Sequence, residues 1–111
     1  MQTLVLVTSS PGSPEAQRAI ELARTLRAQN RAVQVALLQD AVLAALGHSA
    51  MPAAAAVRDL LAQEVPVYVA EHDLTLRGFS PAVLAAGAHV ADDRRLVDLI
   101  LADASRTLGC F

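Results

Sequence analysis

Three apolar stretches with almost no polar residues constrain the fold of this chain more than any other feature. They cover residues 3–7 (TLVLV), 32–38 (AVQVALL) and 66–70 (PVYVA), and each precedes a polar turn. Strands without regular polar alternation are typical of parallel sheets whose two faces are both covered by helices. The segments between these strands show helical spacing of apolar residues, which indicates an α/β chain.

Capping signals mark where the helices begin. Ser13 is expected to cap a helix that starts at Pro14, and Asp92 to cap one that runs to about residue 103. Weaker signals predict helices over residues 41–46, 52–61 and 81–87, a brief strand over 88–91 and a last strand over 105–111. We therefore expect one three-layer α/β/α Rossmann-like domain over residues 1–111, with a mainly parallel sheet of about five strands.

Side-chain spacing also predicts which face of the last helix is buried. The apolar residues expected to face the core are Leu96, Val97, Ile100 and Leu101.

Composition argues against several classes of function. The net charge is −2 and the nine basic residues, all arginine, form no block, so binding to a phosphate backbone is not expected. Tryptophan is absent and Tyr68 is the only tyrosine, which leaves no platform for stacking bases. The first residues lack signal-peptide features, and no apolar run reaches the roughly 18 residues that span a bilayer. We expect a cytoplasmic protein that binds neither nucleic acid nor membrane.

The loop over residues 9–13 (SSPGS) is a candidate anion site. Ser9, Ser10, Gly12 and Ser13 precede a helix N-terminus, where N–H groups and the helix dipole attract anions. The alternative is a capped turn, which we favour because the spacing matches neither common phosphate-binding glycine motif. Few aromatic residues are available to hold a flavin, and we expect no cofactor and no metal.

Asp40 follows the second predicted strand, and we expect it at the same sheet edge as this loop. It either orients a ligand there or caps the short helix over residues 41–46. We favour the cap, because aspartate is among the preferred N-cap residues.

Glu71, His72 and Asp73 follow the third predicted strand. A carboxylate beside an imidazole can tune a proton-transfer group. Adjacent side chains seldom point the same way, however. We therefore favour a structural role, in which Asp73 caps a short helix and Arg77 pairs with a nearby carboxylate.

Cys110 is the only cysteine, which excludes an intramolecular disulfide and a cysteine-based metal cage. A thiol near the end of the chain is a weak candidate for persulfide or disulfide exchange. The alternative, which we favour, is a small apolar residue on the last strand.

Residues 42–57 carry no formal charge beyond a possible one on His48. The segment can be core. Its two short helices have little polar face, however, and this pattern predicts an exposed apolar surface of the kind that binds partner chains. We expect self-association or complex formation through this segment.

Four segments together resemble the DsrE/DsrF/DsrH family of sulfur-relay proteins, which includes the TusB, TusC and TusD subunits. They are TLVLVTSSP, LLQDAVLAAL, VPVYVAEHDLTLRGF and DDRRLVDL. LLQDAV and the acidic turn before RGF are most similar to the DsrH/TusB branch. The long opening SSPGSPEAQRAIELARTL is more similar to the DsrE/TusD branch.

This resemblance implies a subunit of homo- or hetero-oligomers that relay sulfur as a cysteine persulfide, toward tRNA thiolation or sulfur oxidation. In the DsrE/TusD branch the acceptor cysteine ends the strand before the RG-containing helix, and the matching position here is Ala70. The DsrH/TusB branch also lacks this thiol, so the resemblance implies a non-catalytic accessory subunit. The alternatives are a persulfide carrier that uses Cys110, and a binder of a small anion that uses residues 9–13 with Asp40.

Overall fold

The sheet has five strands, all parallel, in the order β4-β3-β2-β1-β5. The strands are β1 (Gln2–Val7), β2 (Val33–Leu37), β3 (Val67–Ala70), β4 (His89–Ala91) and β5 (Ser105–Cys110). The structure is a computed structural model, and it describes residues 2–102 and 105–110. The parallel sheet expected from the apolar stretches is therefore confirmed.

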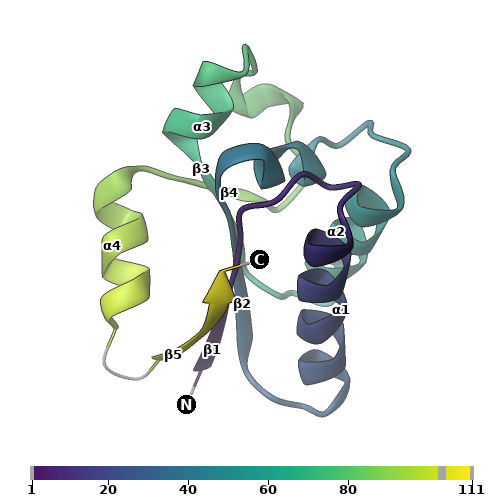
Figure 1. Ribbon diagram of the computed structural model, residues 1–111, viewed down its shortest axis with the longest axis vertical. Coiled ribbons are helices and arrows are strands. Elements are labelled where there is room, and N and C mark those ends of the chain that lie inside the picture. The colour runs from purple at the N-terminus through teal and green to yellow at the C-terminus, as the bar shows by residue number, and fades with distance from the viewer. Residues whose placement is uncertain (1, 103–104, 111) are drawn as a thin grey trace.

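The helices form the two outer layers (Figure 1). Helices α1 and α2 lie together on one face of the sheet, α4 lies on the other, and α3 stands above the end of β3. The α-helices are α1 (Pro14–Ala28), α2 (Pro52–Ala62), α3 (Glu71–Leu76) and α4 (Asp93–Leu101), and the 3₁₀ helices are η1 (Gln39–Ala45) and η2 (Pro81–Val83). This arrangement is the expected three-layer α/β/α architecture.

Valine side chains form the core beneath α1 and α2. Val5, Val35 and Val67 are in register on three neighbouring strands, and all three are fully buried. Helix α1 faces the core mainly with alanine side chains, which allow its backbone to approach the sheet closely. Its buried residues are Ala16, Ala19, Ile20 and Ala23.

The two capping predictions for the longest helical signals are confirmed. Ser13 Oγ accepts a hydrogen bond from the backbone N–H of Ala16 at 3.1 Å, and Asp92 Oδ1 accepts one from Arg95 at 2.8 Å. These bonds satisfy N–H groups that have no partner inside the helix.

The predicted orientation of α4 is wrong in part. Leu96 and Leu99 face the sheet, whereas Val97, Ile100 and Leu101 are exposed. The helix carries two apolar edges, and the spacing alone did not show which of them meets the sheet. Burial of Leu96 and Leu99 favours the observed rotation, and in it the Arg95 guanidinium carbon lies 5.5 Å from the centre of the Tyr68 ring beneath α4.

The short helical predictions also need correction. The segment predicted as a helix over residues 41–46 is the 3₁₀ helix η1, which begins at Gln39, so Asp40 lies inside it. The helix predicted after Ser80 is only three residues long, and the Ser80 side chain makes no capping bond. Gly87 does not end that helix but adopts a positive φ of 94° in the following turn, a conformation that favours glycine.

Residues 42–57 do not form the predicted exposed surface. Most of their apolar side chains are buried, and Met51 is the large apolar residue of this segment that is exposed. Helix η1 packs against α2, α3 and β2, so the lack of charge reflects burial in the core. Within the described residues, no helix is both long enough and apolar enough to cross a membrane.

Candidate functional site

The carboxyl ends of the parallel strands meet at one edge of the sheet, at the top of Figure 1. This is the edge at which open α/β sheets place their binding sites. The loop after β1, helix η1 after β2 and helix α3 after β3 all begin here. The candidate residues from the sequence lie on these elements, except for Cys110, which is the last residue of β5 at the same edge.

The junction of β3 and α3 contains no loop. Ala70 is both the last residue of β3 and the N-cap of α3, with φ −64° and ψ 113°, and it is 2% exposed. It pairs in register with Ala91 of β4. A buried methyl group therefore occupies the position where the resemblance places a sulfur-accepting thiol in related proteins.

Arg77 joins two elements at this edge. Its Nη2 and Nε atoms donate to Asp40 Oδ1 at 2.7 and 3.0 Å, and its Nη1 donates to the backbone carbonyl of Asp73 at 2.9 Å. Asp73 Oδ2 in turn accepts the backbone N–H of Gln39 at 2.8 Å. We call these four residues, Gln39, Asp40, Asp73 and Arg77, the η1–α3 latch.

The latch corrects two predictions. Asp40 does not cap η1, whose N-cap is Leu38 with no side-chain bond, and it pairs with Arg77 instead. Asp73 does not cap α3, since it lies inside that helix. The pairing predicted for Arg77 is confirmed. Gln39, with a φ of 53°, was not identified from the sequence, because nothing about a glutamine signals the left-handed region.

Glu71 and His72 point away from the latch. Together with Thr75, Asp92 and Asp93 they line an open hollow of about 370 Å³ at the ends of β3 and β4. The predicted trio is therefore divided, with Asp73 turned to η1 and its two neighbours turned to this hollow. Carboxylates dominate the lining, so the hollow disfavours thiolate and persulfide anions. No group of three metal-ligating side chains gathers among the residues the structure describes.

The loop over residues 9–13 is largely occupied by its own contacts. The Ser13 hydroxyl donates to the Ser10 carbonyl at 2.7 Å and accepts from the Ala16 N–H, as a capped turn requires. Gly12 is exposed, and a Cβ added there would contact the Met51 methyl at 3.5 Å. Ser9 is half-buried and Ser10 is exposed. Anion binding by this loop stays a prediction.

Cys110 lies on β5, opposite Leu6 and just after a register shift between β1 and β5. Its side chain lies outside the described part of the structure. The strand order places β2 and β1 between β3 and β5, so about 14 Å of sheet separates the strand of Cys110 from that of Ala70. Cys110 therefore lies on a different strand from the position of the missing thiol, and persulfide exchange at Cys110 stays a prediction.

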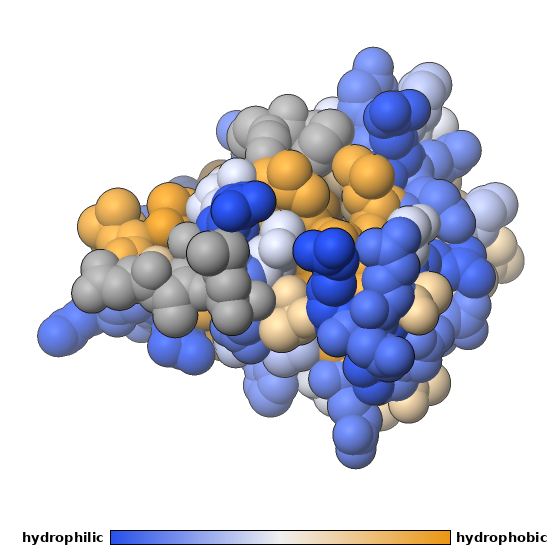
Figure 2. Space-filling view, turned by 90° about the horizontal axis from the view of Figure 1, so that it is seen from below, coloured by the Kyte–Doolittle hydropathy of each residue, from blue (hydrophilic) through white to orange (hydrophobic). Residues whose placement is uncertain are grey.

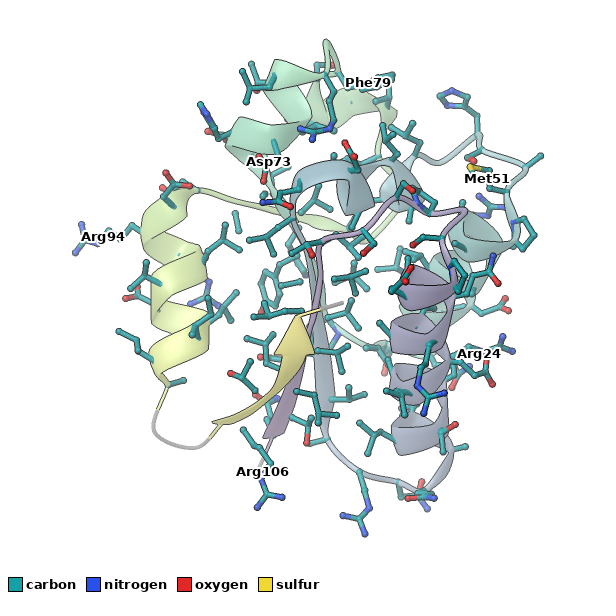
Figure 3. All side chains as sticks on the ribbon, in the orientation of Figure 1. Arg24, Met51, Asp73, Phe79, Arg94 and Arg106 are labelled. Atoms are coloured by element: carbon teal, nitrogen blue, oxygen red, sulfur yellow. The ribbon has the colours of Figure 1, made fainter. Side chains whose placement is uncertain are left out.

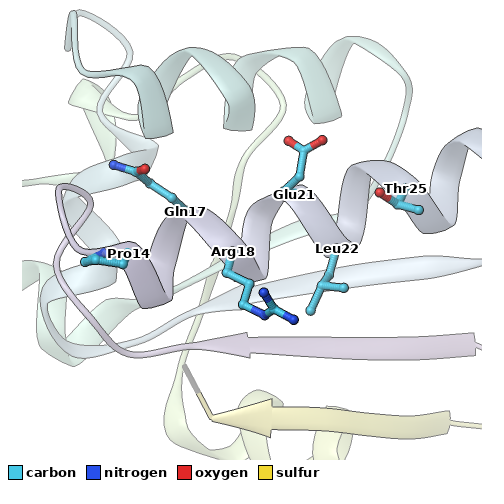
Figure 4. Close-up of a pocket in the computed structure, with 6 residues that line it drawn as sticks. All are labelled: Pro14, Gln17, Arg18, Glu21, Leu22 and Thr25. Carbon is cyan, nitrogen blue, oxygen red and sulfur yellow. The ribbon is translucent and has the colours of Figure 1, made fainter.

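Another open hollow lies elsewhere, along α1 (Figure 4). It has a volume of about 550 Å³; Figure 4 shows Arg18 and Leu22 on the side of α1 nearer β1 and β5, and Gln17 and Glu21 on the side nearer α2. Its lining is the exposed side of a helix, and it contains none of the candidate residues from the sequence.

Exposed apolar side chains gather on α4. Val97 is 51% exposed, Ile100 38% and Leu101 71%. Figure 2 shows apolar side chains at its left, where α4 ends. This surface is not predicted from the sequence, because all three residues are expected in the core; the spacing of Leu96 and Leu99 is the signal for the other orientation.

Comparison with known proteins gives consistent results. A family model described as "DsrH like protein" matches residues 13–105. The crystal structure of the ychN protein from E. coli aligns with a TM-score of 0.85 and 28% sequence identity, over 100% of both chains. MTH1491 of Methanobacterium thermoautotrophicum, a protein of unknown function, aligns with a TM-score of 0.74 over 96% of this chain and 98% of that one; at 15% identity it supports the fold alone. No curated protein sequence matches the chain.

Proposed function

The chain belongs to the DsrH-like family, and from this premise we propose that it acts as a non-catalytic accessory subunit of a sulfur-transfer complex. As a sulfur-relay family protein it would work in the cytoplasm, beside related subunits that carry the persulfide. The sulfur would pass to tRNA thiolation or to sulfur oxidation.

The observation that carries the proposal is the buried methyl group of Ala70. Persulfide relay needs a thiolate that a donor protein can reach. Ala70 has no sulfur atom. A donor protein also cannot reach this position, because the chain turns from β3 directly into α3 above it.

The surroundings of position 70 support the same conclusion. Glu71 and Asp73 lie in the first turn of α3 and offset the positive end of that helix. The η1–α3 latch also holds α3 against η1. Hydrogen bonds between side chains and backbone groups therefore cover the carboxyl edge of the sheet beside position 70. An edge of this kind is suited to contact a neighbouring subunit rather than to exchange sulfur.

Purification of the tagged chain from its own cells at native abundance tests the proposal. We expect it to elute in a stoichiometric complex with at least one related sulfur-relay chain that has a cysteine at the end of its third strand. Recovery of the chain without any such subunit, under conditions where its own assembly is intact, would contradict the proposal.

A further inference from the structure

Helix α4 presents an outward stripe that combines apolar and charged side chains. Arg94, Val97, Asp98 and Leu101 follow the spacing i, i+3, i+4 and i+7, so they lie on one side of the helix. All four are exposed, with Leu101 at 71% the most exposed large apolar side chain among the described residues. The opposite side of the helix, with Leu96 and Leu99, faces the sheet.

The stripe has no intramolecular partner in the described part of the chain. Helix α4 is the one helix there that covers its face of the sheet, and Arg94 points away from the molecule (Figures 1 and 3). Arg94 and Asp98 form no ion pair with each other or with other described residues. Their order along the helix, with the basic residue first, is the weaker arrangement for such a pair.

We propose that the stripe is the contact surface for a second copy of this chain, with two α4 helices packed antiparallel about a two-fold axis near Val97. A two-fold contact uses the same surface on both copies, so the surface must complement itself. In this arrangement the Arg94 end of each helix lies against the other helix near its Asp98 and Leu101. Two ion pairs then flank an apolar centre of valine and leucine side chains.

The charge pattern favours a second copy over a partner whose surface carries charges of a single sign. A surface of a single sign would pair with either Arg94 or Asp98 and repel the other. The antiparallel copy satisfies both charges at once, and complementary charges of this kind set orientation and partner choice.

The size of the surface predicts the strength of the contact. A helix of nine residues is about 14 Å long. It therefore buries less than the roughly 800 Å² per partner that is typical of stable complexes. Tyr68 and His89, on the same face of the sheet, are not fully buried and extend the area only modestly. We expect self-association that depends on chain concentration.

Sedimentation of the purified chain up to millimolar concentration tests the contact. The variants are Arg94→Asp and Asp98→Arg, each of which places like charges opposite each other in the paired helices. We expect each to raise the dissociation constant at least about tenfold. Arg18→Asp, at an exposed position on α1, makes the same charge change on the other face of the sheet and should leave the constant unchanged. Circular dichroism and melting temperature confirm that the variants fold.

An equimolar mixture of the two variants provides the decisive comparison. The acidic surface of one then meets the basic surface of the other, and both ion pairs are restored with reversed sign. Each variant still carries two like charges on its own α4 helix, so the mixture changes nothing within a chain. Recovery of the dissociation constant to within about threefold of wild type must therefore come from contacts between chains.

A chain that stays monomeric at millimolar concentration would overturn the inference. So would single variants that associate like wild type, or a mixture that does not recover. The inference rests on the proposed function only in that both require subunits to assemble. The sedimentation experiment uses the purified chain alone, so its failure leaves the complex with cysteine-bearing subunits to be judged by co-purification.

Discussion

Arg77 and Asp40 form a hydrogen-bonded ion pair between α3 and η1, although they lie 37 residues apart in the sequence. The pair holds α3, which follows β3, against η1, which follows β2. Arg77 also donates to the Asp73 carbonyl, and the Asp73 carboxylate accepts the backbone N–H of Gln39 in η1. Three hydrogen bonds therefore join α3 to η1 at the edge of the sheet beside Ala70, two donated by Arg77 and one donated by the Gln39 backbone.

Replacement of Arg77 should loosen this edge without unfolding the chain. We expect Arg77→Met to lower the free energy of unfolding by about 1 kcal/mol, because the pair is partly exposed and water compensates for some of the loss. Urea unfolding measures the change, with Arg18→Met as the matched control. A double-mutant cycle with Asp40→Asn should give a coupling of about 0.5 kcal/mol, and no coupling would show that the latch does not stabilise the fold.

Substitution of a core alanine tests the packing of α1 on the sheet. Ala23 is fully buried, and Ala23→Asp would place a carboxylate among apolar side chains. We expect a loss of several kcal/mol in the free energy of unfolding. Gln17→Asp, at an exposed position of the same helix, serves as the control and should melt near wild type. If the two variants melt alike, α1 does not cover the sheet.

Two leucines of α4 test the orientation of that helix. Leu99 is 6% exposed and Leu101 is 71% exposed. Leu99→Ala should cost about 2–4 kcal/mol in unfolding free energy, because it leaves a cavity beneath the helix, whereas Leu101→Ala should cost less than about 0.5 kcal/mol. Thermal or urea unfolding at low chain concentration gives both values. The reverse order would support the orientation that the sequence predicted.

Reintroduction of a thiol at the end of β3 tests the closure of that site. In a Cys110→Ser background, Ala70→Cys supplies the only thiol of the chain. Burial should raise the pKa of this thiol above the ordinary value of about 8.5, so we expect it to react with a disulfide reagent in urea but only slowly in the folded protein. Equal reaction rates in both states would mean that position 70 is open to solvent.

Local signals in the sequence predict most of the fold. The apolar stretches identify the strands because a parallel sheet buries both faces, and Ser13 and Asp92 mark helix starts because their side chains bond the first backbone N–H groups. The position of Ala70 at the end of a buried strand follows from the same local pattern.

What the sequence could not predict depends on tertiary contacts. The partner of Asp40 comes from a helix that meets η1 only after the sheet has formed. The rotation of α4 depends on which apolar edge fits the sheet beside Tyr68. The uncharged segment over residues 42–57 has the same composition whether it is buried or exposed, and only its neighbours make it core.

In the proposed function, this chain takes part in sulfur relay without carrying sulfur. Intact mass, recorded without reductant after incubation with a cysteine desulfurase and cysteine, tests that claim most directly; a sulfur-relay protein with a cysteine at the end of its third strand serves as the positive control. We expect the control to gain the mass of sulfur and this chain to keep its mass. A gain of one sulfur atom by this chain, lost in Cys110→Ser, would contradict the account and identify Cys110 as a persulfide carrier.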